Sequence, residues 1–276
     1  MGASKPDIKL LVLDIDGTIA GRSNAVREPV LAAVAAAKAK GIRVAIATGR
    51  MFRSAQRFAE AVGADLPIVS YNGAWIKDPQ TEAVHWHQPV GRELAGELLD
   101  YFEQPEWRKT VSVHFYIDDK LYVRDLSPAS ESYASRSGIE AIAVGDLRNT
   151  LATEPTKILA LSPDADEIAR VTAGLKARYG PEELYCTRSV PTFIEACHPK
   201  VSKGEAVCFL AEQMLGFAAE NVMAIGDNFN DLEMLKYAGL GIAMGSAPDR
   251  VKAAAQWVAP DVEADGAAAA IAQFLL

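Results

Sequence analysis

The sequence contains few of the residues that form disulfide frameworks or thiolate metal sites. Only three cysteines occur among 276 residues, and no Cys-x-x-Cys pair is present. An odd number of scattered cysteines indicates a reducing compartment and excludes a cysteine-based zinc site. Histidine is also scarce, with four residues. We therefore expect a cytoplasmic protein whose chemistry depends on other side chains.

Long apolar segments and long basic segments are missing as well. The longest apolar runs, such as residues 29–37, are far shorter than the roughly 18–20 residues of a membrane span. The first ten residues lack the hydrophobic segment of a secretory signal. Lys and Arg total 28 against 36 Asp and Glu, so the net charge is −8. These features predict a protein that binds neither membranes nor nucleic acid.

The first third of the chain alternates between apolar runs and helix-forming segments. Strands are expected at residues 8–13, 42–47 and 67–71, and helices at residues 28–40 and 51–62. Gly41 and Gly63 follow the two helices, where glycine commonly ends a helix. A strand–helix–strand series with tight turns predicts a parallel sheet with functional loops at the carboxyl ends of its strands.

The middle of the chain has a different pattern, with helices expected at 94–102 and 164–179 and strands at 111–117, 121–123, 157–161 and 183–186. The first pattern then returns, with a helix at 203–215, strands at 221–225 and 239–243, and a last helix from about residue 265. We therefore predict an α/β protein with a Rossmann-like parallel-sheet core and an inserted α+β domain. The core should comprise residues 1–81 and 190–276, and the insertion residues 82–189.

Two carboxylates follow the first expected strand, in the segment Asp14-Ile15-Asp16-Gly17-Thr18. Residues two apart in extended backbone point to the same side. Carboxylates held close together repel each other, which raises a pKa unless a cation lies between them. Taken alone, the segment is equally consistent with an ordinary polar turn.

A second acidic segment, residues 226–231, follows the expected strand at 221–225. It lacks the glycine and glutamate that a calcium-binding EF-hand loop requires at its sixth and twelfth positions. A helix N-cap would explain Asn230 or Asp231 but not Asp227. Carboxylates at the ends of two parallel strands can converge on a hard cation such as Mg²⁺.

Two further segments are suited to an anion. Thr48-Gly49-Arg50 ends the second expected strand and precedes a helix, whose N-terminus favours negative charge. Lys203 opens a helix, where the helix dipole disfavours a lysine, so a use beyond helix formation is suggested. An ordinary solvated lysine is the competing interpretation.

In this order and spacing, these four motifs resemble those of the haloacid dehalogenase-like hydrolase superfamily. The position of the insertion resembles the type-two cap of that superfamily. The insertion, together with Asn72-Gly73-Ala74 before it, is most similar to the Cof-type sugar phosphatases. The resemblance covers nearly the whole chain and implies a phosphoric monoester hydrolase with an aspartyl-phosphate intermediate.

The resemblance also implies a role for each motif residue. Asp14 would be the nucleophile, and Asp16 would protonate the leaving group and then activate water. Mg²⁺ would be held by the side chains of Asp14 and Asp227 and by the backbone carbonyl of Asp16. The phosphate would be bound by Thr48, Gly49, Lys203 and Asn230. Asp231 would orient Lys203 or a metal-bound water, and the candidate substrate contacts are Arg50, Asn72 and Gly73.

Two alternative functions share this chemistry. A phosphomutase would return the phosphoryl group to a substrate, and a non-enzymatic phosphoaspartate switch would be phosphorylated by a partner. A switch needs neither a leaving-group acid nor a lid, so Asp16 and the insertion favour an enzyme acting on a small phosphorylated metabolite. His85 and His87 would share one face of a strand as a candidate metal pair, but no third ligand is near them in the sequence.

Overall fold

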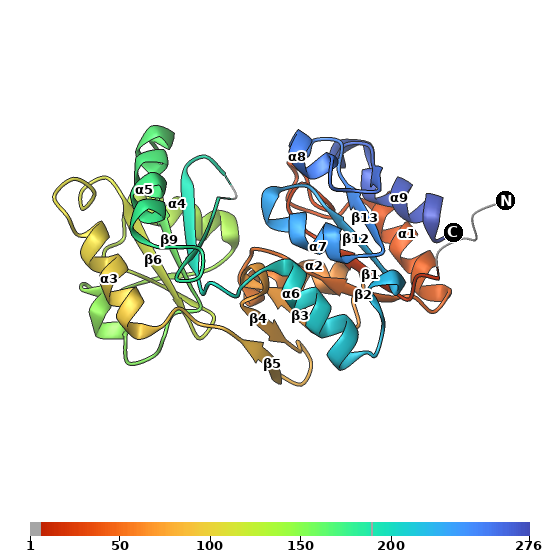
Figure 1. The fold of residues 1–276 in the computed structure, drawn as a ribbon, viewed down its shortest axis with the longest axis horizontal. Helices are drawn as coiled ribbons and strands as arrows, with labels where there is room; N and C mark the ends of the chain where they lie inside the picture. The colour runs from red at the N-terminus through yellow and green to blue at the C-terminus, as the bar shows by residue number, and fades with distance from the viewer. Residues whose placement is uncertain (1–6, 189) are drawn as a thin grey trace. The chain divides into compact units, whose positions relative to one another are not determined.

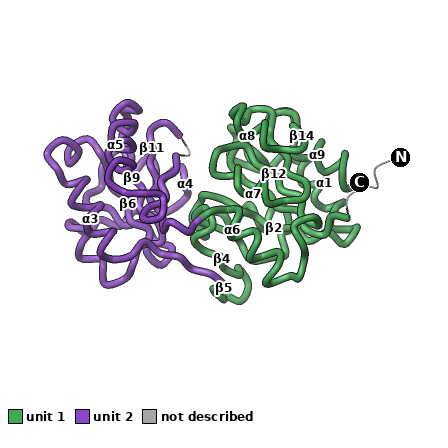
Figure 2. Tube along the Cα trace, viewed as in Figure 1, with its two compact units in different colours: residues 1–85, 202–276 green, residues 86–201 purple. Residues whose placement is uncertain are grey.

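The computed structural model describes residues 7–188 and 190–276, which divide into two compact units (Figures 1 and 2). Unit 1 consists of the described residues up to His85 together with Ser202–Leu276. Unit 2 consists of Trp86–Val201. Unit 1 is thus discontinuous in sequence, whereas unit 2 is one continuous segment.

Unit 1 is built around a five-stranded sheet with the order β14-β13-β12-β1-β2, in which every pairing is parallel. Its strands are β1 (Leu10–Leu13), β2 (Arg43–Ile46), β12 (Val222–Gly226), β13 (Leu240–Ala243) and β14 (Trp257–Val258). All residues of β1 and β12 are buried, as expected for strands covered on both faces. The expectation of an α/β fold with a parallel core sheet is confirmed.

Helices provide the crossovers that parallel strands require. They are α1 (Glu28–Ala39), α2 (Phe52–Ala61), α6 (Lys203–Cys208), α7 (Leu232–Tyr237), α8 (Asp249–Lys252) and α9 (Gly266–Phe274). The helix that α6 begins continues as a π-helical segment to Met214. The α1 helix is rich in alanine and has a proline in its first turn, two features that favour helix formation.

A small antiparallel sheet follows the first helices, with the order β3-β4-β5. Its strands are β3 (Ile68–Ser70), β4 (Trp75–Lys77) and β5 (Val84–His87). The sequence placed β3 in the parallel sheet, but β3 pairs antiparallel with β4 and meets the segment after β2 only through an isolated bridge between Ala47 and Val69. The chain reverses direction in the turn η1 (Tyr71–Gly73), and all three residues of this turn have positive φ angles.

Unit 2 contains a six-stranded sheet with the order β10-β11-β9-β6-β7-β8. The strands are β6 (Ser112–Ile117), β7 (Lys120–Val123), β8 (Ala141–Ala143), β9 (Lys157–Leu161), β10 (Tyr185–Thr187) and β11 (Phe193–Cys197), and the helices are α3 (Arg92–Phe102), α4 (Pro128–Ser137) and α5 (Ala165–Arg178). Residues of α3, α5 and one face of the sheet form its hydrophobic core, among them Leu99, Phe115, Ile158 and Leu175.

The two units divide at residues different from those proposed from the sequence. The first division lies after His85 instead of residue 81, and the second after Val201 instead of residue 189. The second difference arises because β11, which the sequence analysis did not expect, pairs with β9 and β10 and therefore belongs to unit 2. No helix among the described residues has both the length and the apolar composition needed to cross a membrane.

Candidate active site

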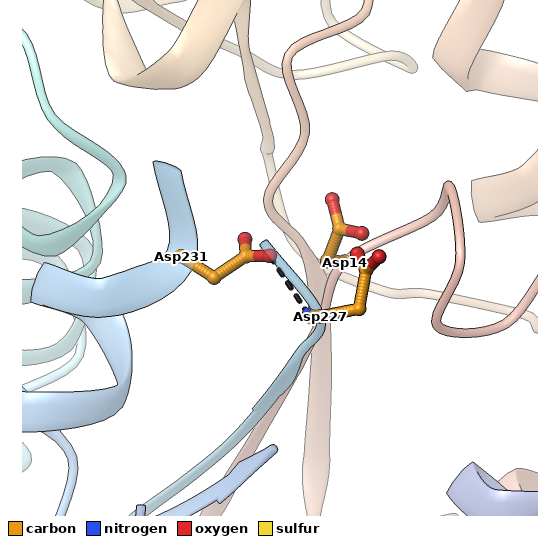
Figure 3. A group of neighbouring side chains, drawn as sticks. All are labelled: Asp14, Asp227 and Asp231. Carbon is orange, nitrogen blue, oxygen red and sulfur yellow. Dashed lines mark hydrogen bonds between the residues drawn. The ribbon is translucent and has the colours of Figure 1, made fainter. Parts of the chain in front are cut away.

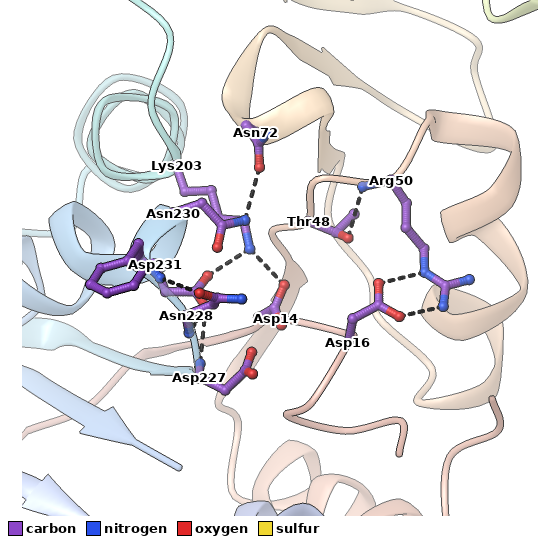
Figure 4. Close-up of polar contacts among 11 residues, drawn as sticks. Asp14, Asp16, Thr48, Arg50, Asn72, Lys203, Asp227, Asn228, Asn230 and Asp231 are labelled. Atoms are coloured by element: carbon purple, nitrogen blue, oxygen red, sulfur yellow. Dashed lines mark hydrogen bonds and ion pairs between the residues drawn. The ribbon is translucent and has the colours of Figure 1, made fainter. Parts of the chain in front are cut away.

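Four segments of unit 1 bring polar side chains to one edge of the core sheet (Figure 4). Asp14 directly follows β1, and Asp227 directly follows the neighbouring strand β12. Thr48 lies two residues beyond β2, and Lys203 is the first residue of α6. The carboxyl ends of adjacent parallel strands share one edge of a sheet, which is why residues so distant in sequence meet here.

Lys203 is the central cation of this group and has no exposed surface. Its Nζ donates hydrogen bonds to Asp14 Oδ1 and to Asp231 Oδ1, and each donor–acceptor distance is 2.6 Å. Burial alone would lower the pKa of Lys203, but the charges and hydrogen bonds of the two carboxylates raise it above its ordinary value. The lysine therefore stays protonated and holds a fixed positive charge beside Asp14.

Three carboxylates, those of Asp14, Asp227 and Asp231, lie close together in this part of the site (Figure 3). One oxygen from each of Asp14, Asp227 and Asp231 lies within 4.8 Å of the others. Burial, with added repulsion from Asp231 and Asp16, raises the pKa of Asp14 to about 7 despite Lys203. Burial and the charges of Asp14 and Asp231 likewise raise the pKa of Asp227 to about 8. This surplus of negative charge on oxygen ligands suits a hard divalent cation.

Asp231 already uses both of its carboxylate oxygens. Oδ1 accepts from Lys203, while Oδ2 accepts the backbone N–H groups of Asp227 at 2.9 Å and Asn228 at 3.0 Å. A side chain at Gly226 would collide with Asp231, because an added Cβ would lie 2.5 Å from the aspartate Cβ. Asp231 is thus a fixed scaffold for Lys203 and the Asp227 loop, which leaves Asp14 and Asp227 as the better-placed metal ligands.

Asp16 points away from the acidic cluster and toward Arg50 (Figure 4). Its side chain is 61% exposed, and its two oxygens accept from Arg50 Nε at 2.7 Å and Nη2 at 2.5 Å. Arg50 is itself held by a 2.8 Å hydrogen bond to Asn24 Oδ1 and by the ring of Phe58, 4.5 Å from its guanidinium carbon. The Asp16 carboxylate is therefore oriented separately from Asp14.

The remaining motif residues are held by hydrogen bonds or by close packing. Thr48 is buried, and its hydroxyl accepts the backbone N–H of Arg50 at 3.1 Å. Asn230 Nδ2 donates to Asn72 Oδ1 at 2.9 Å. Gly73 packs against the backbone of Ser202, because an added Cβ would collide with the Ser202 carbonyl oxygen. This packing explains the glycine without any substrate contact.

Two site residues were not singled out by the sequence analysis. Asn24 has a positive φ of 53° in the loop after β1, and nothing in its sequence context indicates a contact with Arg50. Asn228 caps the short helix η5 (Phe229–Asp231) by accepting the N–H of Phe229 at 2.8 Å. Its place in the acidic segment was the signal that could have identified it.

The histidine pair considered from the sequence is used differently. His87 Nε2 lies 2.9 Å from the Thr156 hydroxyl, within unit 2. Neither His85 nor His87 belongs to a candidate metal-binding group formed by the described residues.

The comparison with protein families agrees with the geometry of the site. The model of the family described as haloacid dehalogenase-like hydrolase matches residues 11–271. The chain belongs to this family. The resemblance inferred from the motifs is thereby confirmed, as is the expectation of a phosphoric monoester hydrolase.

Individual relatives match over almost their whole length. A Bacillus subtilis protein provisionally named as the phosphatase YxeH is 31% identical, over 97% of this chain and 98% of the relative. Another B. subtilis protein, named 5-amino-6-(5-phospho-D-ribitylamino)uracil phosphatase YcsE, is 28% identical over 98% and 97%. The crystal structure of a haloacid dehalogenase-like hydrolase from Bacteroides thetaiotaomicron has a TM-score of 0.85 and 27% identity, and the match covers 96% of this chain and 99% of that one.

Proposed function

We propose that this hydrolase is a Mg²⁺-dependent phosphatase that cleaves small phosphorylated metabolites through an aspartyl-phosphate on Asp14. The observation that carries the proposal is the position of Lys203, bound to Asp14 at 2.6 Å inside a cluster of three carboxylates. A nucleophilic carboxylate must approach a phosphate that is also anionic. Phosphoryl transfer is therefore favoured where fixed positive charge neutralises the reacting oxygens.

Asp14 and Asp227 are the side chains that would hold the metal, together with the backbone carbonyl of Asp16. Their carboxylate oxygens are the ligands that Mg²⁺ prefers. Burial, together with repulsion from the neighbouring carboxylates, raises the pKa of Asp14 and of Asp227, and a bound cation would relieve that repulsion. When bound, Mg²⁺ would neutralise charge on the phosphoryl oxygens and on Asp14. Asp231 would keep Lys203 and the Asp227 loop in place.

The phosphoryl oxygens would be bound by donors around Asp14. These are the Thr48 hydroxyl, the Gly49 backbone N–H, the Lys203 ammonium and the Asn230 carboxamide. Gly49 lies just before α2, so the helix N-terminus adds favourable potential for an anion. The four donors come from both ends of the chain, so the phosphate site depends on the complete unit 1.

Asp16 would act as the acid and base of the reaction. As the acid it would protonate the leaving oxygen, and as the base it would then activate the water that hydrolyses the aspartyl-phosphate. Its contact with Arg50 keeps the carboxylate outside the acidic cluster and exposed. We infer that this position reserves Asp16 for the leaving group, because inside the cluster it would compete for the metal.

The leaving group is proposed to be a small polyhydroxylated metabolite such as a sugar. The relative named for a phosphoribitylamino uracil has a phosphorylated polyol chain in the substrate of its name, which supports this class. Unit 2 is proposed to act as the cap that selects the leaving group. Its insertion between the two segments of unit 1 supports this role. The scarcity of cysteine supports a cytoplasmic location.

The decisive experiment combines turnover with detection of the covalent intermediate. The purified protein should release inorganic phosphate from sugar phosphates and from p-nitrophenyl phosphate with Mg²⁺, and lose this activity in EDTA. Acid quenching during turnover should trap radiolabelled phosphate on the peptide containing Asp14. Release without an activating bisphosphate distinguishes a phosphatase from a phosphomutase. A stable phosphoprotein without turnover would instead indicate a switch.

Asp14→Ala should abolish turnover and phosphate incorporation while the protein stays folded. Lys203 keeps Asp231 as a partner in this variant, and one buried carboxylate with a raised pKa is removed. Asp249 is an exposed aspartate, so Asp249→Ala is a matched control and should keep full activity. Activity of the Asp14 variant within about tenfold of the parent, at an equal folded fraction, would exclude Asp14 as the nucleophile.

A further inference from the structure

We propose that Asn72 is a positioning residue, whose buried side chain fixes Asn230 and the Thr48–Gly49 loop in the geometry that binds phosphate. The proposal rests on the phosphatase function proposed above. It assigns Asn72 a role through other residues, in place of the direct substrate contact expected from the sequence.

The backbone of η1 adopts a costly conformation. Tyr71, Asn72 and Gly73 have successive φ angles of 53°, 59° and 98°. The left-handed region disfavours residues with a Cβ, although asparagine tolerates it better than most. Two consecutive non-glycine residues in this region persist only where the surroundings fix them, and such turns cluster at functional sites.

The turn is tied to the segments that carry the phosphate-binding groups. The Tyr71 N–H donates to the Arg50 carbonyl at 2.8 Å, and the Asn72 N–H donates to the Thr48 carbonyl at 2.9 Å. Gly73 packs against the carbonyl of Ser202, the residue immediately before Lys203. The turn therefore sets the position of the Thr48–Arg50 loop and supports the beginning of α6.

The Asn72 side chain fills the space between two phosphate-binding residues. It is 1% exposed, and its Oδ1 accepts from Asn230 Nδ2 at 2.9 Å (Figure 4). A Cβ added to Gly49 would lie 2.8 Å from Asn72 Oδ1, and its three nearest neighbours would all be Asn72 side-chain atoms. One carboxamide oxygen thus sets the orientation of the Asn230 amide and lies directly against Gly49.

The first test is a double-mutant cycle. Asn72→Gly removes the side chain but keeps a residue suited to the left-handed backbone, and Asn230→Ala removes the oriented amide. With p-nitrophenyl phosphate, each single variant should lower kcat/KM by about tenfold, the usual effect of losing one buried hydrogen bond. Inhibition by inorganic phosphate should weaken in parallel.

The kcat/KM of the double variant should be about equal to that of the less active single variant. The losses should not multiply, because both substitutions remove the same oriented amide. If the two losses multiply, Asn72 acts independently of Asn230 and the proposal is overturned. An unchanged kcat/KM in Asn72→Gly would overturn it as well. If the parent protein released no phosphate from any substrate, the proposed function would fail instead, and the packing test below would still apply.

The second test measures packing without any assumption about activity. Gly49→Ala introduces the Cβ that would press on Asn72, so it should lower the unfolding midpoint in urea in the parent background. In the Asn72→Gly background, Gly49→Ala should lower the unfolding midpoint clearly less, because the Asn72 side-chain atoms that the new Cβ would meet are absent. Gly96→Ala, at a position where an added Cβ meets nothing within 4 Å, is the control and should behave alike in both backgrounds. Equal costs of Gly49→Ala in both backgrounds would contradict the proposed contact.

Discussion

Asp14 and Asp16 are two residues apart, yet their side chains lie in very different surroundings. Asp14 is buried, bonded to Lys203, and has a pKa raised to about 7. Asp16 is largely exposed and paired with Arg50. A pair of carboxylates separated in this way can divide the work of nucleophile and acid–base catalyst, because each has its own neighbours.

At the residue scale, this division predicts a burst in the Asp16→Asn variant. Nitrophenolate is a good leaving group and needs little protonation, so the first step should continue. The second step needs a base to activate water, which asparagine cannot supply. Stopped-flow absorbance should therefore show the rapid release of one nitrophenolate per enzyme, followed by a slow steady state. Asp14→Ala should show no burst. A linear trace at the parental rate would contradict the role proposed for Asp16.

The turn after β1 is shaped by a glycine that touches the opposite side of the site. Gly17 has a φ of 83°, and an added Cβ would collide with the Asp227 carboxylate. The absence of a side chain at this position lets the end of β1 and the loop after β12 approach each other closely. The element that carries Asp14 and the element that carries Asp227 are thus fitted together at one residue.

At the element scale, Gly17→Ala should weaken metal binding. The methyl group should displace Asp227, so the Mg²⁺ concentration for half-maximal activity should rise by about tenfold or more. Gly138→Ala is a matched control: its φ of 66° imposes a similar backbone strain, but an added Cβ there meets nothing within 4 Å. The control should lose some stability and keep the parental Mg²⁺ dependence. An unchanged Mg²⁺ titration for Gly17→Ala would show that Asp227 does not hold the metal.

The strands predicted from the sequence agree best with the structure where a local run of apolar residues determines them. The strand expected at residues 157–161 is β9, and the apolar runs before Asp14 and Asp227 are adjacent parallel strands. The prediction failed where distant partners decide. The β11 strand is defined by its pairing with β9 and β10. The antiparallel pairing of β3 with β4 depends on η1, which reverses the chain through positive φ at two non-glycine residues.

The same distinction applies to the site. The convergence of Asp14, Asp227 and Lys203 follows from strand ends and helix starts, which a sequence can indicate. The pairing of Asp16 with Arg50 depends on the directions of two side chains, which strand and helix patterns do not specify.

At the scale of the whole molecule, the described residues of unit 2 contribute no strand to the core sheet of unit 1. Replacing residues 86–201 with a short Gly/Ser linker should therefore leave a metal-binding core that hydrolyses p-nitrophenyl phosphate. Discrimination among sugar phosphates should fall far more, as measured by the spread of kcat/KM across a substrate panel. A shortened protein that kept the parental ranking would show that unit 2 is not the specificity element.

Unit 2 should also make stability depend on pH through His114. Burial, with a smaller effect from Lys157, lowers the pKa of this histidine to about 3, well below its ordinary 6.5. Between these values the unfolded chain takes up a proton that the folded chain does not, so the free energy of unfolding falls as the pH decreases below 6.5. The loss should be about 1.4 kcal/mol per pH unit at most.

The measurement is urea unfolding at pH 7 and pH 5 for the parent and for His114→Gln, which cannot titrate. The variant is expected to be less stable at pH 7 but to lose less stability on acidification. Taking the difference between the two proteins cancels the titration of the other groups. Parallel pH dependences for the two proteins would mean that His114 is protonated in the folded state.

The order of strands in unit 1 has a consequence for synthesis on the ribosome. Leu10 of β1 pairs with Val222 of β12, and all of unit 2 is translated between them. At roughly 5–20 residues per second, β12 is synthesised about 10 to 40 s after β1. Unit 2 is continuous and emerges complete during that interval, whereas the apolar β1 and β2 are still without β12. The nascent chain should therefore depend most on chaperones in this window, and a stalled ribosome would release a folded unit 2 attached to an unfinished, inactive core.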